Sequence, residues 1–203
     1  MEDEEPPVPQ AAPKLRVVAG GVPRATDAER HVGRDDELNE LPSSDRLLFE
    51  RFAPYVARIA LRLLGREAEV DDVVQEVLLA AFQQRDRIRE PRAFRGWLGT
   101  VTVRTARRKL RYRRMRSFVG LDTVPAVPEL RDADIGPEKR AVLSRVYRCL
   151  DRIPVEQRLA WTLRYVEGEQ LDAVADKCGC SLATAKRRIA AAHARLQMEL
   201  DDA

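Results

Sequence analysis

The stretch from Glu169 to Gln197 constrains the fold most, because it holds two helical patterns separated by a glycine-containing turn. Apolar residues between Leu171 and Ala175 have the spacing of a short amphipathic helix, and Gly179 follows where such a helix ends. Ser181 is a suitable N-cap for a second helix. The predicted apolar stripe of this second helix consists of Leu182, Ala185, Ile189, Ala192 and Leu196.

The remaining faces of the second helix are basic. They carry Lys186, Arg187, Arg188, His193 and Arg195. A short helix, a turn with glycine and a longer basic helix are typical of a helix-turn-helix that binds DNA. An ordinary helical hairpin has the same pattern when its basic residues are simply solvated, so this stretch alone leaves both interpretations open.

Composition favours an all-α protein. Aromatic residues make up only 5% of the chain, while arginine, leucine and alanine are abundant. A length of 203 residues allows one domain or two small ones. No apolar run approaches the ~20 residues of a membrane span, and the acidic start MEDEEPP is unlike a signal peptide, so we expect a cytoplasmic protein without membrane insertion.

The three cysteines are Cys149, Cys178 and Cys180, too few for a disulfide framework. The Cys178-x-Cys180 pair with His193 raises the idea of a zinc site. A structural zinc site needs four ligands, however, and this spacing is not that of a zinc finger. We therefore expect small apolar residues at a turn, with no metal and no cofactor.

Charge is distributed unevenly. Residues 1–44 contain ten acidic residues against five Lys and Arg, together with several prolines, and are predicted to be a disordered acidic tail. The rest of the chain is near +8, although the whole chain is only +3. A basic body of this kind suggests a polyanionic partner.

Residues 45–118 contain three helical patterns. The first runs from Asp45 to Leu64, with Pro54 at a predicted kink or restart and Gly65 at its end. The second covers 67–84, and Pro91 is suited to open the third. The predicted buried side of the third helix consists of Phe94, Trp97, Leu98 and Val101.

Two surface features of this part stand out. Asp72, Gln75, Glu76 and Leu79 follow an i, i+3, i+4, i+7 spacing and form one exposed ridge, which is either solvated or a protein-docking surface. The segment 104–116 holds eight basic residues and no acidic one. Such a helix repels itself unless its charge is neutralised, which favours a nucleic-acid partner over a solvated face.

Residues 119–137 are rich in proline and acidic residues and are predicted to be a linker. Beyond it, the pattern over 142–153 predicts a helix, Pro154 starts another, and a turn is expected at Glu167-Gly168. The sequence thus predicts an all-α fold of two small helical domains joined by a flexible acidic linker, with a helix-turn-helix in the second.

Three motifs in this order resemble the extracytoplasmic-function group of the sigma-70 family. The family's polymerase-binding helix is similar to AEVDDVVQEVLLAAF, and its minus-ten segment to FRGWLGTVTVRTARRKLRYRR. The domain that reads the minus-thirty-five element resembles LDRIPVEQRLAWTLRYVEGEQLDAVADKCGCSLATAKRRIAAAHARL. The resemblance implies a sigma factor that binds core RNA polymerase and directs promoter recognition, DNA melting and transcription initiation, while the polymerase does the chemistry.

The resemblance also implies domains and site residues. Region 2 would occupy 45–118 and region 4 would occupy 138–203. The implied polymerase-binding residues, on the clamp helices of its largest subunit, are Asp72, Gln75, Glu76 and Leu79. The implied minus-ten residues are Trp97, Arg104, Arg107, Arg108, Lys109, Arg111 and Arg113. Those implied for the minus-thirty-five duplex are Ser181, Thr184, Lys186, Arg187 and Arg188.

Three positions depart from the family's pattern. Arg104 and Arg108 stand where the family often has Asn and Asp, and Arg187 stands in place of a usual Ser.

The family further implies an anti-sigma factor as a candidate partner. Two other hypotheses fit parts of the pattern: a stand-alone helix-turn-helix regulator, and a helical interaction module with incidental basic faces.

Overall fold

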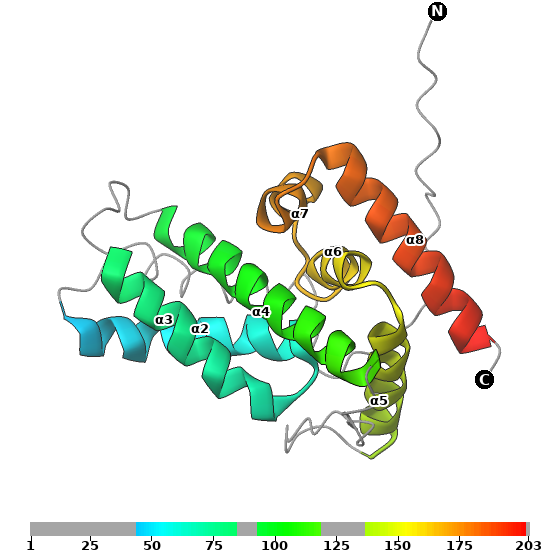
Figure 1. Ribbon diagram of the computed structural model, residues 1–203, viewed down its shortest axis with the longest axis horizontal. Coiled ribbons are helices and arrows are strands. Elements are labelled where there is room, and N and C mark those ends of the chain that lie inside the picture. The colour runs from blue at the N-terminus through cyan, green and yellow to red at the C-terminus, as the bar shows by residue number, and fades with distance from the viewer. Residues whose placement is uncertain (1–43, 85–92, 119–136, 202–203) are drawn as a thin grey trace, which may run out of the picture.

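The computed structural model describes residues 44–84, 93–118 and 137–201, and all regular structure in these ranges is helical (Figure 1). The helices are α2 (Asp45–Leu64), the 3-10 turn η1 (Glu67–Glu69), α3 (Val70–Gln84), α4 (Phe94–Phe118), α5 (Pro137–Arg152), α6 (Val155–Tyr165), α7 (Leu171–Cys178) and α8 (Leu182–Asp201). The all-α prediction is confirmed. The predicted tail up to residue 43, Pro91 and the predicted linker up to residue 136 lie outside the described residues.

The first helix has the ends that its sequence favours. The hydroxyl of Ser44 accepts a hydrogen bond from the Leu47 N–H at 3.3 Å, which satisfies one free donor of the first turn. Gly65 ends α2 in the left-handed conformation, with φ of 69°. Pro54 lies inside α2, which continues through it as one helix rather than restarting.

The predicted helix-turn-helix, made of α7 and α8, is also formed. Gly179 has φ of 62°, and the N–H groups of Gly179 and Cys180 return to carbonyls of the last turn of α7. Ser181 caps α8 by accepting from the Thr184 N–H at 3.2 Å. Leu182 does not join the buried stripe, because it is the first residue of α8 and lies one turn before the first packed residue; it is 39% exposed.

We call α2, η1, α3 and α4 the N-terminal group, and α5 to α8 the C-terminal group. The two groups pack directly on each other, since α4 contacts both α6 and α7, and α2 contacts α6 (Figure 1). One hydrophobic core runs through both groups. Its C-terminal members are Leu159, Ala160, Leu163, Val174, Ala175, Cys178, Ala185 and Ile189. The packing of these groups was not foreseen from the sequence.

Two glycines of the N-terminal group lie at close contacts, Gly65 with α5 and Gly99 with both α2 and α7. A Cβ on Gly65 would lie 2.3 Å from Cδ1 of Tyr147 on α5. A Cβ on Gly99, which is buried within α4, would lie 3.1 Å from the Tyr55 hydroxyl and 3.2 Å from Cε of Lys177 on α7. Gly65 therefore cannot carry a side chain at the observed spacing, whereas a Cβ at Gly99 would need its neighbours to shift by a few tenths of an ångström.

Candidate functional site

The ridge predicted on α3 is formed. Asp72, Gln75 and Leu79 are exposed and Glu76 is half-buried, while the opposite side of α3 is in the core. Leu79 is 54% exposed and is flanked by acidic and amide groups of the same ridge. The four residues thus present one continuous face that combines negative charge with an apolar position.

The structure brings this ridge next to the basic segment of α4. Nζ of Lys109 lies 2.9 Å from Oδ2 of Asp72, and Arg108 forms an ion pair with Glu76. The hydroxyl of Thr105 also lies within 3.4 Å of the Glu76 carboxylate. The residues implied for polymerase and those implied for minus-ten DNA are therefore direct neighbours, which sequence reasoning did not find.

The basic segment of α4 has two sides. Arg104, Arg108 and Arg111 are exposed. Arg107 is turned toward the C-terminal group, where its Nη2 donates to the Cys178 carbonyl oxygen at 2.7 Å. Carboxylates of the chain itself neutralise much of this segment, so self-repulsion by itself does not require a nucleic-acid partner.

Arg113 links elements of both groups. Its guanidinium donates to the Leu64 carbonyl oxygen at 3.2 Å and lies 3.6 Å from carboxylate oxygens of both Glu69 and Asp151. Burial, with the neighbouring charge of Arg158, lowers the pKa of Arg113 to about 10. In this arrangement Arg113 faces the interface between the groups rather than solvent, and a role in DNA binding stays a prediction.

Trp97 is half-buried. Its ring stacks on Phe94, with 5.9 Å between ring centroids and 14° between ring planes. Val101, which was predicted to be buried beside it, is also only half-buried, because Thr102, Thr105 and Ala106 take the inner face of α4. Trp97 is thus held by one ring face and keeps part of its surface accessible.

The N-terminal part of α8 presents the residues implied for upstream DNA. Ser181, Lys186 and Arg187 are exposed, and Thr184 is half-buried with its hydroxyl 2.9 Å from that of Ser181. Arg188 points inward instead, with Nη1 3.4 Å from Oε2 of Glu156. Four of the five residues therefore lie on an accessible surface around the helix start.

Glu156 is the residue that sequence reasoning missed. One carboxylate oxygen lies 2.7 Å from Nη2 of Arg111 and 3.3 Å from Nε of Arg107, while the other faces Arg188. Its sequence context gave no signal of this, because an acidic residue in the first turn after Pro154 is explained locally by the helix dipole. A single carboxylate thus joins the basic segment of α4 to α8.

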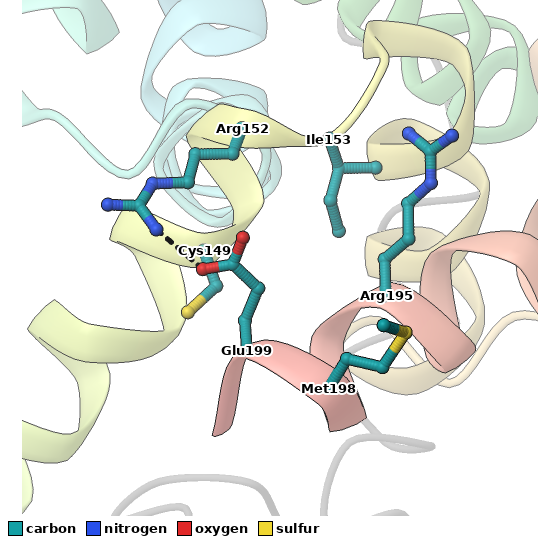
Figure 2. A pocket seen from close by; sticks show the side chains of 6 residues that line it. All are labelled: Cys149, Arg152, Ile153, Arg195, Met198 and Glu199. Carbon is teal, nitrogen blue, oxygen red and sulfur yellow. Dashed lines mark hydrogen bonds and ion pairs between the residues drawn. The ribbon is translucent and has the colours of Figure 1, made fainter. Parts of the chain in front are cut away.

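A small open hollow lies between the end of α5 and the end of α8 (Figure 2). Cys149, Ile153, Arg195 and Met198 line it, and an ion pair of 2.6 Å between Arg152 and Glu199 closes one side. None of the predicted site residues lines this hollow. Over the described ranges, no three metal-ligating side chains cluster, and no helix has the length and apolarity to cross a membrane.

Comparisons with known proteins match the two parts of the chain that carry the sequence motifs. The family model described as Sigma-70 region 2 matches residues 48–116, and the one described as Sigma-70, region 4 matches residues 143–196. The chain is 32% identical over 160 residues to the ECF RNA polymerase sigma factor SigL of Mycobacterium tuberculosis, covering 77% of this chain and 89% of SigL. It is 30% identical over 165 residues to the sigma factor CnrH of Cupriavidus metallidurans, covering 74% and 86%.

Solved structures of similar fold come from the same group. The sigma factor RpoE of Bartonella quintana, solved with the anti-sigma factor NepR, aligns with a TM-score of 0.57 at 22% identity, covering 73% of this chain and 91% of RpoE. CnrH, solved with the cytosolic domain of CnrY, aligns with a TM-score of 0.56 at 24% identity, covering 83% and 96%. The chain therefore belongs to the extracytoplasmic-function sigma factors of the sigma-70 family, the non-enzymatic proteins that direct RNA polymerase to promoters and initiate transcription.

Proposed function

We propose that three surfaces of this sigma factor divide its work. The ridge on α3 docks on the clamp helices of the polymerase's largest subunit, the basic side of α4 holds minus-ten DNA, and the start of α8 contacts the minus-thirty-five duplex. The observation that carries this assignment is the adjacency of the α3 ridge and the α4 arginines, which would place the DNA strand beside the polymerase contact.

The polymerase contact rests on the ridge of Asp72, Gln75, Glu76 and Leu79. Its exposed leucine supplies apolar area that can be buried on docking, and the carboxylates around it can pair with basic residues of a partner. In the free chain these carboxylates form ion pairs with Arg108 and Lys109 and remain partly exposed.

The minus-ten contact combines charge with an aromatic platform. Arg104, Arg108 and Arg111 are exposed on α4 and can meet phosphates, while Trp97 is accessible for stacking with an unpaired base. The positive segment would then hold the opened strand next to the polymerase. Arg107, Lys109 and Arg113 are partly or largely buried in the present arrangement, so they would act there only after a rearrangement.

The minus-thirty-five contact lies at the N-terminus of α8. Ser181 and Thr184 border the free N–H groups of the first turn, where a phosphate is favoured, and Lys186 and Arg187 follow on the exposed face. Together these groups can position the duplex and contact its bases. We extend the assignment to whole domains, with region 2 at 45–118, a linker at 119–137 and region 4 at 138–203.

Two further parts of the proposal come from the family. A cytoplasmic location is part of the proposal, because a sigma factor acts together with RNA polymerase on chromosomal DNA. An anti-sigma factor is a candidate partner, because RpoE of similar fold was solved in complex with the anti-sigma factor NepR. CnrH, also of similar fold, was solved with the cytosolic domain of CnrY.

The decisive test of the ridge uses pull-down of purified core polymerase. The variants Asp72→Lys and Glu76→Lys are expected to abolish association. Arg108→Ala and Lys109→Ala break the same two ion pairs without changing the ridge, and they should retain association. Equal loss in both sets would show that the ion pairs support the fold and that the ridge is not the docking surface.

The promoter contacts are tested by run-off transcription with core polymerase on a genomic library. We expect transcripts from a limited set of promoters that share both an upstream and a downstream element. The variants Lys186→Ala and Arg187→Ala should lower this transcription through the upstream element only. Transcription without a shared upstream element would overturn the assignment of α8.

A further inference from the structure

We propose that Cys178 and Cys180 are a reversible thiol–disulfide pair, in which a hydroperoxide joins the two sulfur atoms and alters the turn between α7 and α8. The inference rests on the proposed function, because this turn leads into the helix assigned to upstream DNA. It gives the chain a modification site whose co-reactant is a peroxide. Oxidation of this site lowers binding to the upstream duplex.

The two cysteines flank one glycine in the turn that joins α7 to α8 (Figure 1). Cys178 is the last residue of α7, Gly179 turns the chain with φ of 62°, and both thiols are free. Two Cα atoms separated by one residue are at most about 7 Å apart in an extended chain, and closer in a turn. A disulfide spans Cα distances of roughly 4.4–6.8 Å, so the pair is within its reach.

The two thiols differ in accessibility, which gives each a separate role. Cys178 is buried in the core, whereas Cys180 is half-buried and packs against the same core. Burial, together with the neighbouring thiol of Cys180, raises the pKa of Cys178 to about 11, so Cys178 stays protonated at neutral pH. Cys180 is therefore the thiol that a peroxide reaches, and Cys178 is the adjacent resolving thiol.

One molecule of hydrogen peroxide suffices for the oxidation. The Cys180 sulfur attacks a peroxide oxygen as the thiolate, the O–O bond breaks, and the released hydroxide leaves as water with the thiol proton. The Cys178 sulfur then displaces the hydroxyl group of the sulfenic acid, which leaves with the second thiol proton as another water. Two electrons from the two sulfur atoms thus reduce the peroxide, and a dithiol reverses the reaction by thiol–disulfide exchange.

The backbone of the pair carries bonds that define the turn. The Cys180 N–H donates to the Ala175 carbonyl oxygen at 3.0 Å, and the Cys178 carbonyl oxygen accepts from the Arg107 guanidinium at 2.7 Å. A disulfide holds the sulfur atoms about 2.05 Å apart and closes a small ring through the Gly179 backbone. No atom lies within 4 Å of the Cβ position of Gly179, so the backbone has room to adjust there. The oxidised turn therefore differs from the reduced one.

The turn is continuous with the proposed upstream contact. Ser181 follows Cys180 directly and caps α8 by accepting from the Thr184 N–H at 3.2 Å. A shift of the Cys180 backbone displaces this cap, together with the free N–H groups that would meet a phosphate. Oxidation should therefore weaken binding of the upstream duplex. The ridge on α3 contains neither cysteine, so association with polymerase should be unchanged.

The first test treats the full chain with hydrogen peroxide and compares it with Cys149→Ala, Cys178→Ala and Cys180→Ala. The wild type and Cys149→Ala should each lose the mass of two hydrogen atoms and two maleimide-reactive thiols, and dithiothreitol should restore both. Cys178→Ala and Cys180→Ala should form no disulfide within the chain. Failure of the folded wild type to form the bond, or a bond that includes Cys149, would overturn the inference.

The second test measures DNA binding of the reduced and oxidised forms. Fluorescence anisotropy uses a labelled mixed-sequence duplex of about 30 base pairs at low salt, where phosphate contacts dominate. We expect oxidation to weaken binding by the wild type and Cys149→Ala about fivefold, as for loss of one cap, with recovery after reduction. Cys180→Ala should bind equally with and without peroxide treatment.

Two results would overturn the link between the disulfide and DNA. One is equal affinity of the disulfide form and the reduced form. The other is loss of core polymerase in a pull-down of the disulfide form, which would indicate general unfolding. Failure of the proposed function is distinguishable: if reduced Arg187→Ala binds the duplex as tightly as the reduced wild type, α8 is not a DNA contact, while the mass change still reports the disulfide.

Discussion

Arg158 of α6 donates two hydrogen bonds to the carbonyl oxygen of Leu63 in the last turn of α2, from Nε at 3.1 Å and from Nη2 at 2.9 Å. The same Nη2 lies 2.9 Å from the Leu64 carbonyl oxygen, and Nη1 bonds Asp151. The last carbonyls of a helix lack partners within it and carry partial negative charge. A buried arginine from the C-terminal group thus completes the end of a helix in the N-terminal group.

Replacing this arginine should therefore be severe. Arg158→Met keeps much of the side-chain volume but leaves the Leu63 carbonyl without a donor and Asp151 without its buried partner, and it should lower the free energy of unfolding by about 3 kcal/mol. Urea denaturation followed by circular dichroism measures the change. Arg152→Met is the matched control, because it breaks an exposed ion pair with Glu199 and should cost below about 1 kcal/mol. Similar losses in both variants would contradict the role of Arg158.

Gly65 and Gly168 form a matched pair for steric effects. Both have positive φ, 69° and 73°, but only Gly65 is packed against a side chain, the ring of Tyr147. Gly168→Ala should cost about 1 kcal/mol from backbone strain alone. Gly65→Ala should cost about 3 kcal/mol, because overpacking adds to that strain. Thermal unfolding compares the two, and equal costs would show that Tyr147 moves aside without penalty.

Cys178 predicts a pH dependence of stability. Burial raises the pKa of its thiol from 9.0 to about 11, so the folded chain keeps a proton that the unfolded chain releases first. The contribution is fully present below about pH 9 and is lost as the pH rises toward about 11. Stability of the wild type relative to Cys178→Ala should fall across this window. Parallel pH profiles in chemical denaturation would contradict the assignment.

Ser181 should combine a structural and a functional effect. Ser181→Ala removes the N-cap of α8 and should cost about 1 kcal/mol. It should also weaken binding to an upstream duplex while leaving binding to a single-stranded minus-ten oligonucleotide intact. Ser44→Ala is the control, since it removes the equivalent cap of α2 and should change stability without affecting duplex binding. Weakened binding to both DNA probes would argue against separate contacts.

Local features of the chain were predictable because they depend on a few neighbouring residues. The ends at Gly65 and Gly179, the cap at Ser181 and the start of α6 after Pro154 all follow from the conformations that these residues favour. The exposed ridge on α3 follows equally from helical periodicity. The family resemblance, which rested on the order of three such local motifs, is confirmed for the same reason.

Partnerships between distant residues could not be predicted in this way. Periodicity indicates which face of a helix is polar but not which group it meets, so the pairing of Asp72 with Lys109, 37 residues away, was invisible. The sequence of α4 predicts a single basic surface, whereas the structure divides its arginines between solvent and the interface between the groups. Arg113 is the clearest case, because nothing in its sequence context distinguishes it from the exposed arginines around it.

Gly99 is a glycine in the middle of α4 at its contact with two neighbouring helices, α2 and α7. A glycine in the middle of a helix such as α4 costs roughly 1 kcal/mol relative to alanine, and no positive φ explains its presence. What the position offers is room for the Tyr55 hydroxyl and for the Lys177 side chain of α7. The position therefore sets how closely the surface of α4 can approach α2 on one side and α7 on the other, and an alanine here would be accommodated only by small shifts of Tyr55 and Lys177.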